Sequence, residues 1–279
     1  MEVKQIVGEE FRRMQLLELD MLKEFDRVCR ENEIKYTVFG GTLLGAIRHK
    51  GYIPWDDDAD IAMLREDFEK FRSVAHLLDE KICYFQDHKN DPEYRWGYAK
   101  LRRTGTRFVR VGQEHLKCKT GLFIDIFPMD DIPMCTVAQM VNDFYCFCLR
   151  KILWSEVGKI NEKNAFMRWI YKLLSHIKPS FVYKRLDRMA RKSKNTSPNR
   201  VRCLLFPATG KLYKKNSLKT RYGMPKDWFI DLAEYDFEDM KVFGTKDYDE
   251  NLKYIYGDYM KLPDEKGREP HSPVSDYSF

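Results

Sequence analysis

The 279-residue sequence predicts an α/β (α+β) fold, in which a mixed β-sheet is flanked by helices and carries a basic helical insertion. Two observations lead to this prediction. Residues 9–127 alternate between segments with helical apolar spacing and short segments rich in β-branched and aromatic residues, as expected when helices pack on a sheet. Residues 136–193 lack such strand-like segments and are rich in Lys and Arg, which indicates a separate helical region.

The expected elements follow from the local pattern in chain order. Helices are expected over residues 9–32 and 65–78, because apolar side chains recur there every three or four positions. Strands are expected where β-branched and aromatic residues dominate, over residues 36–39, 60–64, 82–86, 97–102, 107–111 and 122–127. A mainly helical region follows over residues 136–193, and the polar patch at 194–199 indicates a loop.

Three carboxylates, Asp56, Asp58 and Asp60, occupy alternate positions just before the apolar residues 61–64. In an extended segment, side chains two positions apart point to the same side, so this spacing brings three carboxylates together. Carboxylates this close repel one another unless a divalent cation lies between them, which favours a Mg²⁺ or Mn²⁺ site. On this interpretation Asp57 faces the other way and supports the structure.

The acidic run also has two other interpretations. An acidic run is often only a solvated surface, but this one lies between Trp55 and a predicted buried strand. A calcium-binding EF-hand loop also begins with alternating acidic residues, but it needs Gly at its sixth position and Glu at its twelfth. This chain has Ile61 and Asp67 at those positions, which excludes that loop.

Gly40 and Gly41 lie between the predicted strand 36–39 and an apolar helical run at 43–47. A glycine pair at such a turn lets backbone N–H groups approach a phosphate, and the helix N-terminus adds positive potential. A glycine pair alone usually marks only a turn. Together with the nearby carboxylates, it predicts a phosphate cradle that faces a metal site.

Asp125 lies inside the apolar segment 122–127, where a lone carboxylate is costly unless it is paired or bound to a metal. A structural ion pair and a functional carboxylate both remain open at this point. Asp130 and Asp131 follow Pro128 and are expected in a turn.

The run FGGTLLGAIRHKGYIPWDDDADIAMLREDFEKF resembles the signature block of the LicD family, phosphocholine transferases related to fukutin and fukutin-related protein. Residues 98–101 with Thr104, GLFIDIFPMDDI from Gly121 and YGDYMKLP from Tyr256 also agree with that family. The resemblance implies a nucleotidyltransferase-like catalytic core over residues 1–135, a basic helical region over 136–226 and a C-terminal segment over 227–279 that returns to the active site.

The resemblance also implies a reaction: Mg²⁺-dependent transfer of phosphocholine from CDP-choline to a sugar hydroxyl of a lipid-linked, cell-surface glycan precursor, of the teichoic acid or lipopolysaccharide type. CMP is the product that leaves. One alternative is transfer of another phospho-alcohol, such as ribitol phosphate from its CDP donor. The second alternative is that the chain is a non-catalytic member of the family that binds nucleotide.

The family pattern assigns roles to particular residues of this sequence. Asp58 and Asp60 match its paired carboxylates, and Asp125 matches a third as metal ligand or general base. The implied catalytic residues are Asp58, Asp60 and Asp125, and the implied metal ligands are these three with Asp56. The implied substrate-binding residues are Gly40, Gly41, Thr42, Arg48, Trp55, Lys100 and Tyr256.

These assignments leave alternatives. Lys100 is a candidate phosphate contact, and by sequence alone it could equally be a surface lysine. Arg48 could contact the donor phosphates or cytidine. Choline, a quaternary ammonium, is held by aromatic faces, for which Trp55 and Tyr256 are candidates, although Trp55 could simply anchor its loop.

The charge of the chain is unevenly distributed. The total is +6, but residues 150–226 hold 21 Lys and Arg against Glu156, Glu162 and Asp187. This segment therefore carries +18 and leaves −12 for the rest. Such a segment suits an anionic surface, either lipid headgroups or nucleic acid, and no known nucleic-acid motif is present. Apolar residues at helical spacing in 166–177 fit either a helix packed on its own domain or one lying on a membrane.

The seven cysteines show no metal-binding spacing, so we expect reduced thiols in the core of a cytosolic protein. The first residues contain no apolar signal segment, and no apolar run is long enough to cross a bilayer. We therefore expect a cytoplasmic protein, with contact at the inner face of the membrane as an additional hypothesis.

Overall fold

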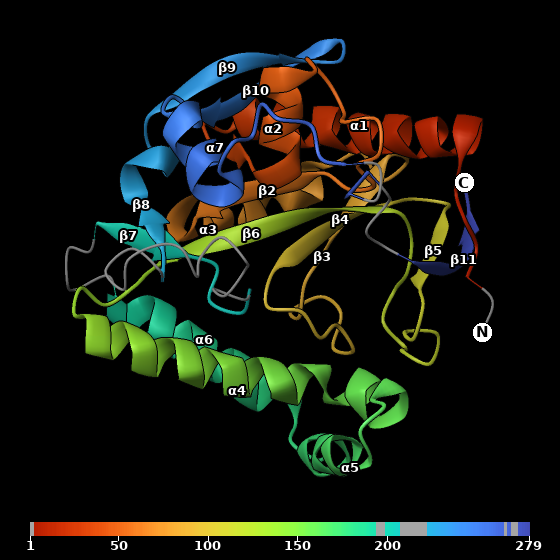
Figure 1. The fold of residues 1–279 in the computed structure, drawn as a ribbon, viewed down its shortest axis with the longest axis vertical. Coiled ribbons are helices and arrows are strands. Elements are labelled where there is room, and N and C mark those ends of the chain that lie inside the picture. The colour runs from red at the N-terminus through yellow and green to blue at the C-terminus, as the bar shows by residue number, and fades with distance from the viewer. Residues whose placement is uncertain (1–2, 194–198, 207–221, 265–266, 269–272) are drawn as a thin grey trace.

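A computed structural model of the chain describes residues 3–193, 199–206, 222–264, 267–268 and 273–279. The mixed α/β fold predicted from the sequence is confirmed (Figure 1). Its helices are α1 (Gly8–Glu31), α2 (Gly40–Arg48), α3 (Arg65–Val74), α4 (Thr136–Asn161), α5 (Ala165–Leu174), α6 (Pro179–Ser193) and α7 (Tyr248–Tyr256). Short 3₁₀ helices cover Ala75–Leu77 and Lys226–Phe229.

The main sheet has seven strands, and its principal path runs in the order β1-β2-β6-β4-β3. These strands are β1 (Thr37–Val38), β2 (Asp60–Leu64), β3 (Cys83–Gln86), β4 (Ala99–Arg103) and β6 (Phe123–Asp131). β7 (Arg200–Arg202) pairs with the end of β6, and β8 (Met224–Pro225) pairs with β7. β2 and β6 are parallel, whereas the other pairs in this sheet are antiparallel. The sheet is therefore mixed, and its parallel pair lies at its centre.

Two small antiparallel sheets complete the described strands. β9 (Leu232–Phe237) and β10 (Met240–Thr245) form a hairpin. β11 (Val274–Ser278) pairs with β5 (Arg107–Arg110), so the C-terminal end of the chain lies beside its N-terminal part, where Lys4 bridges to Val274. Figure 1 shows both termini at this edge of the molecule.

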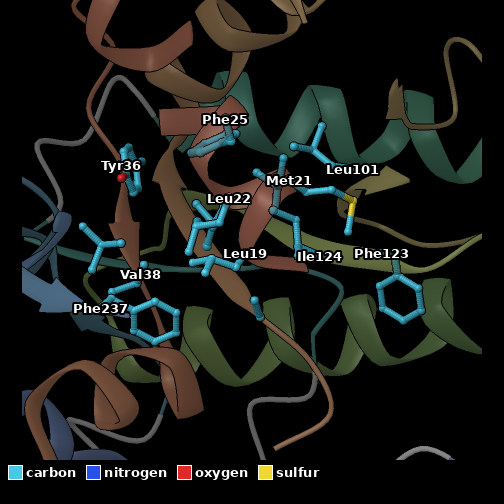
Figure 2. Close-up of a cluster of buried hydrophobic side chains, with 14 of the residues drawn as sticks. Leu19, Met21, Leu22, Phe25, Tyr36, Val38, Leu101, Phe123, Ile124 and Phe237 are labelled. Atoms are coloured by element: carbon cyan, nitrogen blue, oxygen red, sulfur yellow. The ribbon is translucent and has the colours of Figure 1, made fainter. Parts of the chain in front are cut away.

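The main hydrophobic core lies between α1 and the sheet (Figure 2). Met21, Leu22 and Phe25 of α1 are fully buried and meet side chains such as Leu101 and Ile124 from the strands. Burying one such side chain contributes about 1.5–3 kcal/mol. The apolar face of α1 therefore fixes this helix on the sheet, and its buried Gln15 hydrogen-bonds to the carbonyls of Ile53 and Asp56.

Helices α4, α5 and α6 lie on the opposite side of the sheet from α1 (Figure 1). They share a separate core that includes Leu149 and Leu153 of α4 with Val182 and Leu186 of α6. None of the helices in the described parts of the chain is both long and apolar enough to span a bilayer. The division of the chain at residues 135 and 226 stays a prediction.

Several sequence predictions need correction. The glycine pair does not precede α2 as a turn but forms its first residues, because Gly40 adopts a left-handed φ of +55° that lets the helix begin at once.

Asp130 and Asp131 are not turn residues: β6 continues through them, since β7 pairs with both. Arg65 also forms an ion pair with buried Asp130 at 2.6 Å, which offsets the negative charge of Asp130. Residues 194–198 of the predicted loop lie outside the described residues.

The cysteine prediction holds in part. All seven cysteines are described, and all are free thiols. Five are buried, as expected for core thiols. Cys135, however, is exposed because it precedes the first turn of α4 instead of facing either core.

Candidate active site

Three charged residues meet at one level of three adjacent strands. In the parallel pair β2–β6, Asp60 lies opposite Asp125, and in the antiparallel pair β6–β4, Asp125 lies opposite Lys100. Residues directly opposite each other on neighbouring strands share a face of the sheet. The Asp125 backbone N–H also donates to the Ala59 carbonyl at 2.9 Å, which fixes the start of β2 beside β6. The fold thus brings together residues that are 25 to 65 positions apart in sequence.

Lys100 forms an ion pair with Asp125. The alternative of a surface lysine is wrong, because Lys100 is only 2% exposed. Burial lowers the pKa of Lys100 to about 7, although the Asp125 carboxylate opposes this effect. The ammonium group also lies over the Phe123 ring, 3.3 Å from its centroid. Lys100 therefore places a buried positive charge beside the carboxylates.

The glycine pair allows the carboxylates to approach the N-terminus of α2. A Cβ atom at Gly41 would overlap the Asp56 carboxylate, and one at Gly40 would lie 3.4 Å from Oδ2 of Asp60. Thr42 fixes the same segment, since its Oγ1 accepts a hydrogen bond from the Asp60 backbone N–H at 2.8 Å. Glycine at these positions therefore leaves room for acidic groups at a helix N-terminus, where backbone N–H groups stabilise negative charge.

The acidic loop, residues 56–58, gathers three carboxylates. One oxygen from each of Asp56, Asp57 and Asp58 lies within 4.8 Å of the others. The expectation that Asp57 faces away from its neighbours is therefore wrong. The alternation rule applies to pleated strands, and residues 56–59 adopt no regular structure before β2 begins at Asp60.

Burial and mutual repulsion shape the electrostatics of these acids. Burial, reinforced by the charges of Asp58 and Asp57, raises the pKa of Asp56 to about 8. Burial and the charge of Asp57 raise the pKa of Asp58 to about 6, while Arg110 and Lys100 act in the opposite direction. The pKa of Asp60 is also raised well above its usual range, mainly by burial. Each carboxylate is thus costly to ionise unless a further positive charge binds nearby.

Two arginines extend the positive side of the site. Arg102 is buried and donates hydrogen bonds to Oε1 of Gln86 at 2.6 Å and to the Gly121 carbonyl at 2.7 Å. Arg110 has a buried Nε without a hydrogen-bond partner among the described residues. Both line a small cavity together with Lys100. The carboxylates therefore lie next to positively charged side chains. This arrangement suits a ligand whose phosphate groups contact the positive side chains, while a metal ion links the same phosphate groups to the carboxylates.

Several residues predicted from the sequence line one cavity that runs along α2. It has a volume of about 300 Å³, and five of its lining residues are Gly41, Arg48, Trp55, Asp56 and Tyr256. Lys100 and Asp125 do not line it. The predicted residues therefore divide between an open cavity and the buried strand positions beside it.

The contacts of these lining residues restrict their possible roles. Arg48 donates to the Tyr259 carbonyl at 2.6 Å, which ties α2 to the segment after α7. The Trp55 ring already faces a cation, since the Arg268 guanidinium lies 5.5 Å from its centroid. Tyr256 is 38% exposed. Trp55 and Tyr256 are thus both at the cavity, and Trp55 shows the kind of contact that a cationic ligand could make.

The sequence interpretation missed Glu18 of α1. This residue is 1% exposed and lies on α1 one turn after Gln15, and the charges of Asp58 and Asp57 add to burial in raising its pKa. Gln15 donates through Nε2 to the backbone carbonyls of Ile53 at 3.1 Å and Asp56 at 3.0 Å. An acidic residue among the apolar positions of a helix was the available signal. Arg110 was missed because arginine in a short strand resembles an ordinary edge residue.

The residues of this site lie in a part of the chain that resembles known proteins. Residues 33–151 match the family model described as LicD/FKTN/FKRP, nucleotidyltransferase domain. The chain is 29% identical over 270 residues to the lipopolysaccharide cholinephosphotransferase LicD of Haemophilus influenzae, which covers 93% of this chain and 95% of that protein.

Two uncharacterized rickettsial proteins match shorter parts of this chain. The Rickettsia typhi protein is 44% identical over 54 residues, and the Rickettsia prowazekii protein is 49% identical over 47 residues. These matches cover 19% and 17% of this chain and 18% of each relative. The family model covers β1, α2, the acidic loop and the strands of Asp60, Lys100 and Asp125. The chain is therefore similar to the LicD/FKTN/FKRP family, and its similarity to the nucleotidyltransferase domain of that family extends over residues 33–151.

Proposed function

We propose that this protein transfers phosphocholine from CDP-choline to a sugar hydroxyl of a cell-surface glycan precursor, of the teichoic acid or lipopolysaccharide type, with release of CMP. The observation that carries the proposal is the meeting of Asp60, Asp125 and Lys100 on adjacent strands beside the glycine pair. The similarity to a lipopolysaccharide cholinephosphotransferase along 93% of this chain supports the choice of substrate class.

A divalent cation fits the residues of this site. Asp56, Asp58, Asp60 and Asp125 offer oxygen ligands, which Mg²⁺ and Mn²⁺ prefer. The raised pKa values of Asp56 and Asp58 reflect carboxylates that lack sufficient positive charge around them. Mg²⁺ or Mn²⁺ held by these four residues would neutralise charge on the donor pyrophosphate and favour departure of CMP.

The protein groups have distinct parts in the proposed reaction. The acceptor hydroxyl oxygen forms a bond to the phosphorus next to choline, and the bond from that phosphorus to the bridging oxygen breaks. CMP leaves with that electron pair, and the hydroxyl proton passes to a carboxylate, for which Asp125 is the candidate. Lys100 and Arg110 would balance the phosphate charge, and the backbone N–H groups at the N-terminus of α2, where Gly40 and Gly41 lie, would add positive potential.

The choline group is assigned to the cavity of Trp55 and Tyr256. A quaternary ammonium cannot donate hydrogen bonds, so it is held by aromatic faces instead. The nearest alternative keeps the mechanism but replaces choline by a polyol such as ribitol. A polyol would need hydrogen-bonding side chains, and Asp56, Asp258 and Lys261 also line this cavity.

A non-catalytic, nucleotide-binding role is the second alternative. Such a protein has no need of several buried carboxylates whose ionisation is costly. Asp56 is 8% exposed and its pKa is raised to about 8, and it lies where a donor pyrophosphate is proposed to be held. The retention of these charges favours the catalytic role.

Titration calorimetry with CDP-choline, CDP-ribitol and CDP-glycerol, each with and without Mg²⁺, tests the proposal. We expect Mg²⁺-dependent binding that is selective for CDP-choline and is lost in Asp58→Asn. Selective binding of CDP-ribitol would keep the mechanism and replace the alcohol. Binding of none of the three donors would refute the proposed transfer.

The acceptor is proposed to be lipid-linked, which places the protein at the cytoplasmic face of the membrane. α5 supports this location. Its apolar residues Phe166, Trp169 and Leu173 are 66%, 55% and 51% exposed, and it carries no acidic residue. Exposed Arg168 and Lys172 lie on the same helix. An aromatic and basic helix of this kind suits an anionic lipid surface.

Flotation with phosphatidylglycerol and phosphatidylcholine vesicles tests the membrane contact. We expect the protein to float with the anionic vesicles at low salt. The double variant Trp169→Ser, Leu173→Ser should stay at the bottom of the gradient. CDP-choline binding by that variant serves as the control for folding. If the protein stays behind with both kinds of vesicle at low salt, the membrane contact is refuted.

A further inference from the structure

The first three turns of α4 carry an exposed apolar surface. Five apolar side chains, which we call the α4 stripe, are between 42% and 68% exposed: Val137, Met140, Val141, Phe144 and Phe147. They recur every three or four residues and so share one face of the helix. The opposite face carries Cys146 and Leu149, which pack in the core shared with α6. A contiguous apolar patch that stays exposed is typical of an interaction surface.

α5 covers the same face of α4 further along the helix. Phe144, Lys151 and Gly158 follow one another at intervals of seven residues, which is close to two helical turns. Lys151 donates a hydrogen bond to the Tyr171 hydroxyl of α5 at 2.7 Å. A Cβ atom at Gly158 would overlap the Tyr171 ring. α5 therefore packs on the second half of the face whose first half is the exposed α4 stripe, and Figure 1 shows it beside the C-terminal part of α4.

The charges around the α4 stripe favour an anionic partner. Arg150 and Lys151 lie beside it, with their charged groups 5.6 Å and 5.3 Å from the Phe147 ring centroid. The one acidic residue within 134–149 is Asp143, and it is paired with Arg202 at 2.7 Å. A second copy of this surface would bring the same two cations and no acid to pair with them. A bilayer with anionic headgroups supplies both an apolar interior and the opposite charge.

We propose that the α4 stripe inserts into an anionic bilayer beside α5, so that two helices anchor the protein to the membrane. This inference rests on the membrane location in the proposed function and adds an apolar anchor that has no part in the reaction. α5 combines exposed apolar residues with Arg168 and Lys172, whereas the α4 stripe contains no charge. Interfacial helices bury their apolar face about 5–10 Å into the boundary between headgroups and acyl chains. Salt should therefore weaken the attraction of α5 but not the insertion of the α4 stripe.

Flotation with phosphatidylglycerol vesicles tests the α4 stripe by substitution. We expect the double variant Val141→Ser, Phe144→Ser to bind the vesicles about tenfold or more weakly than the wild type, because two side chains that enter lipid become polar. The matched control is Leu16→Ser, Leu77→Ser, since both leucines are 44% exposed and neither lies on α4 or α5. This control should float as the wild type does. Wild-type binding by the α4 double variant would overturn the inference.

A spin label measures directly whether the α4 stripe enters the bilayer. Cys135 and Cys148, the two cysteines that are not buried, are replaced by Ser, and a nitroxide is attached through Val141→Cys. When anionic vesicles are added, the label should collide more often with dissolved oxygen and less often with a water-soluble nickel complex. A label attached through Leu16→Cys should keep its contacts with water. If the Val141→Cys label stays in water while the protein is bound to vesicles, the inference fails.

Sedimentation without lipid examines the other occupant, a second copy of the chain. A wild-type dimer that becomes a monomer in the α4 double variant would overturn the membrane anchor. Calorimetry with CDP-choline separates this inference from the proposed transfer, because the α4 double variant should bind the donor as the wild type does. If the wild type binds no donor but its label enters the bilayer, the transfer is refuted and the anchor stands. If the donor binds and the label stays in water, the anchor is refuted and the transfer stands.

Discussion

Without a divalent cation, Asp56 should make the protein less stable as the pH rises from about 6 to about 8. The pKa of Asp56 is raised to about 8 in the folded protein, mainly by burial. It is about 3.9 in an unfolded chain. Between these values the folded state keeps a proton that the unfolded state has released, so stability falls with rising pH.

The magnitude follows from proton linkage. One retained proton corresponds to about 1.4 kcal/mol per pH unit, and the effect levels off near the folded pKa. From about pH 6 to about pH 8, Asp56 should therefore remove on the order of 2 kcal/mol from the free energy of unfolding. Asp58, with a folded pKa of about 6, exerts most of its effect below this range.

Urea denaturation of the wild type and of Asp56→Asn, at both pH values with and without Mg²⁺, measures this effect. The difference between the pH dependences of the two proteins isolates the effect of Asp56. It removes the effect of Lys100, whose lowered pKa changes the stability in the opposite direction. Mg²⁺ should stabilise the wild type more at the higher pH, because protons compete with the cation for the carboxylates. Equal pH dependence in the two proteins, or equal Mg²⁺ stabilisation at both pH values, would refute this reasoning.

Two further substitutions test the packing around the site. Replacing glycine by alanine inside a helix normally stabilises the helix by up to about 1 kcal/mol. In Gly41→Ala, however, the new Cβ atom would overlap the Asp56 carboxylate. We therefore expect Mg²⁺-dependent binding of CDP-choline, measured by calorimetry, to weaken by about tenfold or more. Wild-type affinity would show that Asp56 can move without consequence. Arg65→Met leaves Asp130 buried and unpaired and should lower the free energy of unfolding by about 3–5 kcal/mol in urea, with partial recovery on adding Asp130→Asn. A loss below about 1 kcal/mol would contradict the account of this ion pair.

The local elements were largely predictable, because their signals are local. The apolar spacing of α1 and the β-branched residues of β2 each specify one element with its buried face. The end of β6 was not predictable in this way. Asp130 looks like a turn residue until β7 and Arg65, 65 or more positions away in the sequence, provide its pairing and its counter-charge.

The candidate site shows the same limit. The acidic spacing identified the acidic loop, but its irregular backbone brings Asp57 to its neighbours, which the strand rule could not anticipate. Gln15 reaches the acidic loop through the packing of α1, and Lys100 reaches Asp125 through the register of β4. Neither contact is encoded near these residues in the sequence. Carboxylates in a motif can therefore be recognised from sequence, whereas their partners depend on tertiary structure.

A crystal structure with Mn²⁺ and CDP-choline would test the central claim most directly. We expect an anomalous Mn²⁺ peak among Asp56, Asp58, Asp60 and Asp125, with the donor pyrophosphate between that ion and the side of Lys100 and Arg110. Choline should lie near Trp55 and Tyr256. A donor bound away from β2 and β6, or a pyrophosphate bound with no cation at these carboxylates, would contradict it.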